Sequence, residues 1–177
     1  MTARILFVVV AVLTFAIDRI AKVLVERRIA LGDRVEVIGN LFELRHVRNS
    51  GIAFGLFSNA GSLVVAGTLL VGALLFVFML RVEPEDLMTV LGGALITGGA
   101  LGNLVDRISY SYVIDFLHLP HWPTFNVADV AIVAGVSVVV LAQLLAMRDE
   151  IRLARATPAS TSTDTDAQPH PSEGDPS

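Results

Sequence analysis

The chain has 177 residues, of which 54% are hydrophobic, and its mean hydropathy of +0.68 favours a membrane protein over a water-soluble domain. Four of the seventeen acidic residues follow Thr157, where there is no Lys or Arg, so residues 1 to 156 carry thirteen residues of each sign. That balance gives no indication of nucleic-acid binding, and the absence of cysteine excludes disulfides, thiolate nucleophiles and Cys-based zinc sites.

Four apolar stretches are long enough to cross a membrane, because about 30 Å of hydrocarbon needs about 20 helical residues. A secretory signal peptide is rejected for the first stretch, since Asp18, Arg19 and Lys22 continue its helical periodicity and no small-x-small cleavage site precedes them. Four crossings would place both termini on the same side of the membrane. The predicted transmembrane helices span about 5–25, 63–80, 87–105 and 126–147.

Two polar segments connect these helices on one face of the membrane. Residues 34–37 and 43–48 alternate in polarity around Gly39 and Asn40, which predicts a small β-hairpin or sheet with one apolar face within a β-cradle over about 26–60. Residues 106–125 form the second segment, in which residues 118 to 123 are typical of an irregular loop at the membrane interface. The expected fold class is therefore an all-α membrane protein with a small β-cradle and a loop.

The predicted domain organisation is simple. Residues 1–156 form a single membrane-embedded domain, and residues 157–177 are rich in Thr, Ser, Pro and Asp, a composition that cannot bury a core and predicts a disordered acidic tail. Counting Lys and Arg on the two sides does not determine the orientation of the domain in the membrane.

Polar residues inside the predicted helices are informative, because a charged side chain there costs about 2.5 to 3.5 kcal/mol on insertion scales. Asp18 and Lys22 are spaced for an ion pair one helical turn apart, which either stabilises the bundle or supports a site inside it. In the third helix, Gly98-x-x-x-Gly102 offers a smooth face for close helix packing. Asn103 and Asp106 lie on one stripe of that helix, and a structural role is favoured for Asp106.

Two acids near the start of the fourth helix suggest chemistry. Asp129 lies three residues after Asn126 and heads an uncharged apolar run, while Asp115 lies fourteen residues earlier between two apolar neighbours. Asn126 is an N-cap residue by type, so Asp129 could serve only to cap the helix and complement its dipole. Two carboxyls close together in a low-dielectric site would instead share a proton. An aspartic peptidase needs that state, because one carboxylate activates water while the other carboxyl donates to the scissile carbonyl oxygen.

Other chemistries are poorly supplied. The sequence has no His-Glu-x-x-His, no Gly-x-Ser-x-Gly and no phosphate-binding glycine loop. Lys22 is the only lysine, and Asp18 one turn away would keep it protonated, which disfavours a Ser-Lys dyad. We therefore expect no metal and no organic cofactor, because the three histidines before the tail are too scattered for a metal site: His46, His118 and His121.

Five segments, in order and spacing, resemble the motif blocks of the bacterial lipoprotein signal peptidases, also called signal peptidase II, over nearly the whole chain before the tail. They are Asp18-x-x-x-Lys22, Asn49-Ser-Gly51-Ile-Ala53-Phe54, Gly99-Ala-Leu-Gly-Asn103-Leu-Val-Asp106-Arg107, Val113-Ile-Asp115-Phe116 and Phe125-Asn126-Val-Ala128-Asp129. The resemblance implies an aspartic endopeptidase of the bacterial inner membrane with cytoplasmic termini and a β-cradle on the outer face. Its implied substrate is a diacylglyceryl-modified prolipoprotein, cut just before the lipid-bearing cysteine.

The resemblance also assigns roles to individual positions. Asp115 and Asp129 fall where the family has its catalytic aspartates, and Asp18 with Lys22 falls where the family stabilises its helix bundle. We expect a monomer whose partners are these substrates and membrane lipids. The positions at which the family orders the substrate backbone and supports the catalytic pair are Asn49, Gly51, Asn103, Arg107 and Asn126.

Two other classes of function are weighed against this one. A small transporter or proton-coupled channel could line an ion path with Asp18, Lys22, Asn103, Asp106 and Asp129, and would cleave nothing in detergent. A non-catalytic assembly factor could bind a helix through its glycine face, and would survive the loss of both candidate catalytic aspartates.

Overall fold

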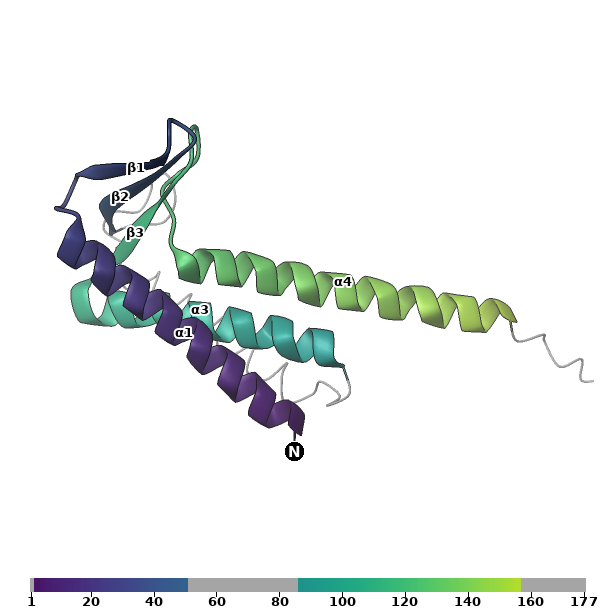
Figure 1. Cartoon of the computed structure of the whole chain (residues 1–177). Helices are drawn as coiled ribbons and strands as arrows, with labels where there is room; N and C mark the ends of the chain where they lie inside the picture. The colour runs from purple at the N-terminus through teal and green to yellow at the C-terminus, as the bar shows by residue number, and fades with distance from the viewer. Residues whose placement is uncertain (1, 51–85, 157–177) are drawn as a thin grey trace, which may run out of the picture.

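The structure is a computed structural model that describes residues 2–50 and 86–156. The predicted second helix, Gly51 and the tail lie outside these residues. Three long helices meet a small sheet at one end of the molecule (Figure 1). In chain order the elements are α1 (Thr2–Arg28), β1 (Arg34–Ile38), β2 (Phe42–Asn49), α3 (Leu87–Tyr110), β3 (Val113–His118) and α4 (Val127–Ala156).

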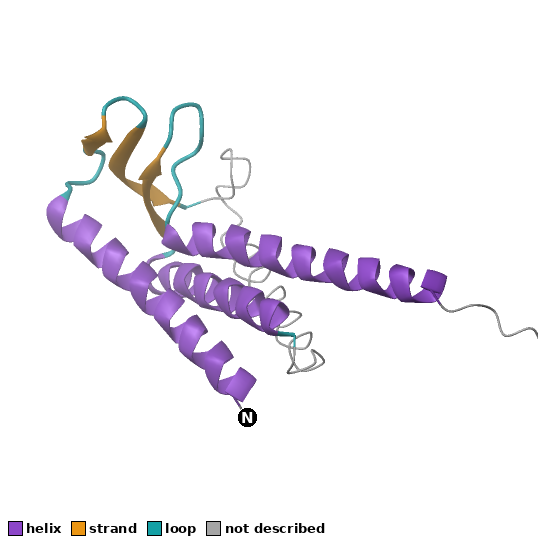
Figure 2. Cartoon of the chain, turned by 45° about the vertical axis from the view of Figure 1, so that its right-hand side comes forward, coloured by secondary structure: helices purple, strands orange, loops and turns teal. Residues whose placement is uncertain are grey.

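Helix α3 lies between α1 and α4 and packs against both of them (Figures 1 and 2). Glycines permit this close approach. A Cβ atom on Gly98 would lie 2.5 Å from the carbonyl oxygen of Ala11 in α1, and one on Gly99 would lie 2.5 Å from that of Ala128 in α4. Gly102 lies against Asp18 of α1 and Ala128 of α4, so the predicted face of Gly98 and Gly102 is formed and lets α1 and α4 both approach α3 closely.

The outer surfaces of the helices are apolar. In the part of the chain that the structure describes, α3 and residues 127–153 of α4 are long and apolar enough to cross a membrane. Large apolar side chains of α4 stay exposed, with Val133 at 67% and Leu144 at 58%, where the core helix of a water-soluble protein would bury them. Helix α1 does not meet the same criterion because Asp18, Arg19 and Lys22 lie in its second half. Four transmembrane helices therefore stay a prediction.

The sheet is antiparallel with the strand order β1, β2, β3. The predicted hairpin is confirmed: β1 and β2 pair around Gly39, whose φ of +45° suits glycine. The expected irregular loop over residues 106–125 is wrong in part, because α3 continues to Tyr110 and β3 follows it as the third strand. Strand β3 pairs along β2, with Asn49 opposite Val113, and so closes the sheet against the helices.

The helices are longer than the apolar stretches predicted. Ser111 ends α3 in the left-handed conformation, with φ +63° and its N–H donating to the carbonyl of Arg107 at 3.0 Å. Helix α4 begins after Asn126, as expected, but extends past the apolar run to Ala156 because charged residues continue the helical conformation. Apolar content marks the part of a helix that avoids water, so it underestimates the full length of each helix.

A small core joins α1 to the sheet. Val25 of α1 and Ile29, which follows the last residue of α1, pack against Phe116 of β3, and all three are buried. His46 of β2 is also buried and its Nδ1 lies 2.8 Å from the carbonyl oxygen of Ile29, at the end of α1. These contacts fix the sheet against the end of α1 and so determine the position of β3.

Candidate active site

Asp129 lies in the first turn of α4 and takes part in a reciprocal cap with Asn126. The side-chain oxygen of Asn126 accepts from the Asp129 N–H at 2.9 Å, and the Asn126 N–H donates to Asp129 Oδ2 at 3.1 Å. The predicted capping role is therefore real. It uses only one carboxylate oxygen, however, because Oδ1 accepts a 2.8 Å hydrogen bond from the amide of Asn103 on α3. Each oxygen of the Asp129 carboxyl therefore accepts one hydrogen bond, and the two donors fix its position.

Asp115 lies on β3 in a drier setting, with 2% of its surface exposed. Its Oδ1 accepts from the Asn126 amide at 2.7 Å and its Oδ2 from the Asn49 amide at 2.8 Å. Burial raises the pKa of the Asp115 carboxyl from 3.8 to about 6. The amide of Asn49 lowers that pKa, the charge of Asp129 raises it, and smaller lowering effects come from Asn126 and Lys22. Burial thus favours the protonated form of Asp115.

Asn126 connects the two carboxyls. Its backbone N–H contacts Asp129, and its side-chain amide contacts Asp115 and also the side-chain oxygen of Asn103 at 3.0 Å. One fully buried residue therefore sets the positions of both acids from the start of α4. The structure brings together the predicted pair and three of the predicted supporting residues: Asn49, Asn103 and Asn126.

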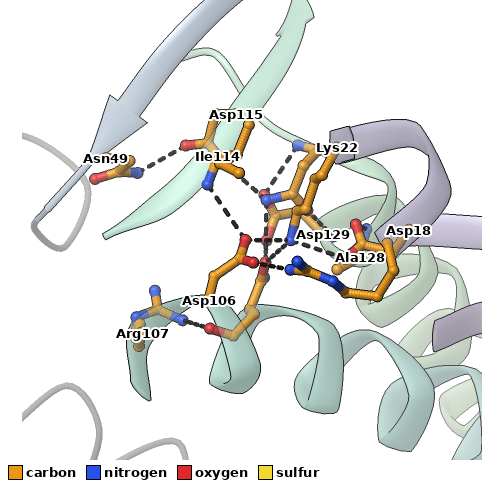
Figure 3. Close-up of polar contacts among 12 residues, drawn as sticks. Asp18, Lys22, Asn49, Asp106, Arg107, Ile114, Asp115, Ala128 and Asp129 are labelled. Atoms are coloured by element: carbon orange, nitrogen blue, oxygen red, sulfur yellow. Dashed lines mark hydrogen bonds and ion pairs between the residues drawn. The ribbon is translucent and has the colours of Figure 1, made fainter. Parts of the chain in front are cut away.

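A group of charged side chains from α1 and α3 lies next to this site. Lys22 Nζ lies 2.8 Å from Asp18 Oδ2 and 2.8 Å from Asp106 Oδ2, and all three side chains are fully buried (Figure 3). The ion pair predicted between Asp18 and Lys22 is formed. Arg19, which sequence reasoning did not assign, pairs with Asp106. Two acids and two bases leave this group with no net charge, as a buried ionic cluster requires.

Backbone N–H groups complete the contacts of the two buried acids. Asp18 Oδ1 accepts from the N–H of Ala128 at 2.9 Å, which ties α1 to the first turn of α4. Asp106 Oδ2 accepts from the N–H of Ile114 at 3.3 Å, which ties α3 to β3. These contacts hold the backbone beside each candidate catalytic residue, since Ala128 precedes Asp129 and Ile114 precedes Asp115.

Arg107 lies at the edge of the site. Its guanidinium is partly buried, donates to the carbonyl of Asn103 at 3.4 Å and lies within electrostatic range of both Asp129 and Asp115. Within residues 2–50 and 86–156 there is no group of three or more His, Asp or Glu side chains placed to hold a metal ion. The side chains present can thus hold and move protons and offer charge to an anion.

Comparison with known proteins agrees with this arrangement. The family described as Signal peptidase (SPase) II matches residues 10–145. A lipoprotein signal peptidase of Moorella thermoacetica is 42% identical over 130 residues, which are 73% of this chain and 87% of that protein. One of Syntrophotalea carbinolica is 37% identical over 154 residues, which are 83% of this chain and 94% of that protein.

Two solved structures are similar to this chain in fold. A structure described as a bacterial membrane enzyme at 2.3 Å resolution superposes with a TM-score of 0.75 at 26% identity, covering 81% of this chain and 90% of that one. A second membrane enzyme, at 1.9 Å, gives a TM-score of 0.72 at 27% identity, over 78% of this chain and 92% of that one. The chain therefore belongs to the signal peptidase II family.

Proposed function

We propose that this chain removes signal peptides from prolipoproteins as an aspartic peptidase, with Asp115 and Asp129 as its catalytic pair. Removal of signal peptides from prolipoproteins is the activity of the family. The aspartic mechanism is supported most directly by one observation: Asn126 holds both carboxyls at once, through its backbone N–H and its side-chain amide. A residue that merely capped α4 would need no contact with a second acid.

The two environments favour distinct roles. Asp129 lies in the first turn of α4 and accepts one hydrogen bond on each carboxylate oxygen, so it is positioned to take a proton from the attacking water. Asp115 is buried, and its raised pKa of about 6 suits it to hold a proton and donate it to the scissile carbonyl oxygen. Water then adds to the carbonyl carbon while the carbonyl oxygen gains the proton from Asp115. Collapse of the tetrahedral intermediate breaks the C–N bond, with a proton passing to the departing amine.

The proposed substrate is a diacylglyceryl-modified prolipoprotein, cut just before its lipid-bearing cysteine. A substrate with two acyl chains and an apolar signal helix remains in the bilayer, so the site that cuts it must lie at the membrane interface. Asp115 and Asp129 lie where the sheet meets the ends of α1 and α4, at the edge of the apolar helix surfaces (Figure 1). We place this edge on the outer face of the bacterial inner membrane, with both termini in the cytoplasm.

A transporter is not favoured. The charged residues that could line an ion path, Asp18, Lys22 and Asp106, are fully buried and occupied by one another, and the chain belongs to a peptidase family. The asparagines around the aspartates also direct their amides at the two carboxyls.

Mass spectrometry of the cleavage product tests this proposal. Purified protein in detergent is given a diacylglyceryl prolipoprotein and, separately, the same chain without lipid. The expected product of the lipidated substrate alone begins at the modified cysteine, and Asp129→Asn forms none. A cut at another position would reject the proposed specificity, and unchanged cleavage by Asp129→Asn would reject the catalytic pair.

A further inference from the structure

Lys22 has a contact that its role in the ion cluster does not require. Besides the two carboxylates, its Nζ donates a 3.0 Å hydrogen bond to the side-chain oxygen of Asn103. An ammonium has three N–H groups, and three acceptors lie within 3.0 Å of this one. Asp18 and Asp106 would suffice to neutralise the charge, so the third acceptor connects the cluster to the site above it.

The side chain of Asn103 can point in two senses, because its amide has a donor end and an acceptor end. Its oxygen faces two donors, Lys22 Nζ and the Asn126 amide, both at 3.0 Å. Its nitrogen faces Asp129 Oδ1 at 2.8 Å. In the flipped sense an NH₂ group would face the ammonium and a second NH₂ group, while a carbonyl oxygen would face a carboxylate. Only the observed sense satisfies all three neighbours.

We propose that Lys22 is a positioning residue for catalysis: from α1 it fixes the sense of the Asn103 amide on α3, so that this amide always donates to Asp129 on α4. This inference rests on the proposed function and extends it to a residue two hydrogen bonds away from the carboxylate. Lys22 is fully buried and contacts neither Asp115 nor Asp129 by a hydrogen bond. Its hydrogen-bonded path to Asp129 runs through Asn103.

The expected consequence concerns the position of the Asp129 carboxylate. If the Asn103 amide loses its fixed sense, Asp129 loses one of its two hydrogen-bond donors and keeps only the Asn126 N–H. Its carboxylate would then be held less firmly against the attacking water, so proton transfer would slow while the substrate would bind as before.

The test must remove this donor without leaving a buried charge unpaired. Lys22→Met alone would leave two acids opposite Arg19, so the variant to make is Lys22→Met with Asp18→Asn, which restores neutrality and keeps an oxygen for the N–H of Ala128. The matched control is Arg19→Met with Asp18→Asn, which also removes one charge of each sign from the cluster but keeps the contact of Lys22 with Asn103. Asp129→Asn serves as the inactive reference.

Steady-state cleavage of a lipidated prolipoprotein is measured as a function of pH, with thermal unfolding of each protein in the same detergent. The Lys22 double variant is expected to lose kcat by about 10- to 100-fold with KM within about twofold at each pH. The control should keep both kcat and KM.

Equal kcat in the Lys22 double variant and the control would overturn the proposal, as would a rise in KM alone or a loss of folded protein confined to the Lys22 double variant. If Asp129→Asn stays inactive in that case, the proposed function survives. Activity in Asp129→Asn would instead reject the proposed function itself.

Discussion

Replacing Asp115 by asparagine should abolish turnover and yet stabilise the folded protein as the pH rises. Each tenfold change in an ionisation equilibrium is about 1.4 kcal/mol, so raising the Asp115 pKa from 3.8 to about 6 costs the native state about 3 kcal/mol once the group is ionised. This penalty is absent below pH 3.8, where the carboxyl is protonated in both states. It grows as the pH rises through about 6 and is constant above that value.

The variant escapes this penalty because its amide does not titrate. It has only one acceptor oxygen for the amides of Asn49 and Asn126, so it loses one hydrogen bond, at a cost of about 1 kcal/mol that does not depend on pH. The difference in Tm between variant and wild type should therefore increase between about pH 4 and pH 8. For a chain of this size about 3 kcal/mol corresponds to about 6–12 °C.

Thermal unfolding in one detergent, at one scan rate and at several pH values, measures this difference. Asp149→Asn on the exposed end of α4 is the control for the removal of a carboxylate that has no place in the site. A difference in Tm between Asp115→Asn and wild type that stays flat across this range, or one that shrinks as the pH rises, would refute the reasoning about burial.

Three further predictions concern the same site. Because Asp115 must hold a proton to donate it, kcat/KM should fall about tenfold per pH unit above its pKa of about 6; a pH–rate profile that is flat from pH 6 to 8 would contradict the assigned role. Asn126→Ala removes the N-cap and the amide at Asp115, so we expect a loss of about 1 kcal/mol in stability and a fall in kcat of about 100-fold, measured by unfolding and by initial rates; near-wild-type kcat would show that the bridge is not needed. Asp18→Ala leaves Lys22 short of a buried partner and should cost about 3–5 kcal/mol of stability. We expect a lower Tm, while kcat/KM of the folded protein keeps its dependence on pH.

Much of this site could be predicted from local patterns. Asp115 and Asp129 were identified by their apolar surroundings and by motif blocks, and the ion pair of Asp18 with Lys22 follows from helical spacing alone. The hairpin was predicted because alternation of polar and apolar residues repeats on both sides of Gly39. These features need only neighbours in sequence, so a single chain carries their signal.

The rest depends on contacts between distant segments. Strand β3 was missed because its partner β2 lies more than sixty residues earlier, as in the contact between Asn49 and Asp115 at a separation of 66. The pairing of Arg19 with Asp106 depends on which side of α1 faces α3, and the glycine packing of the two helices decides that. The bridge made by Asn126 also needs the turn between β3 and α4, which brings the backbone N–H of this one residue to Asp129 and its side chain to Asp115.

The initial rate of signal-peptide release from a lipidated prolipoprotein by wild type, Asp115→Asn and Asp129→Asn tests the central claim most directly. Each protein is first shown to be folded by its unfolding transition in the same detergent, and Asp149→Asn is measured beside them. The account predicts release by wild type and by Asp149→Asn, and none by either site variant. Release at the wild-type rate by Asp115→Asn or by Asp129→Asn, in folded protein, would contradict it.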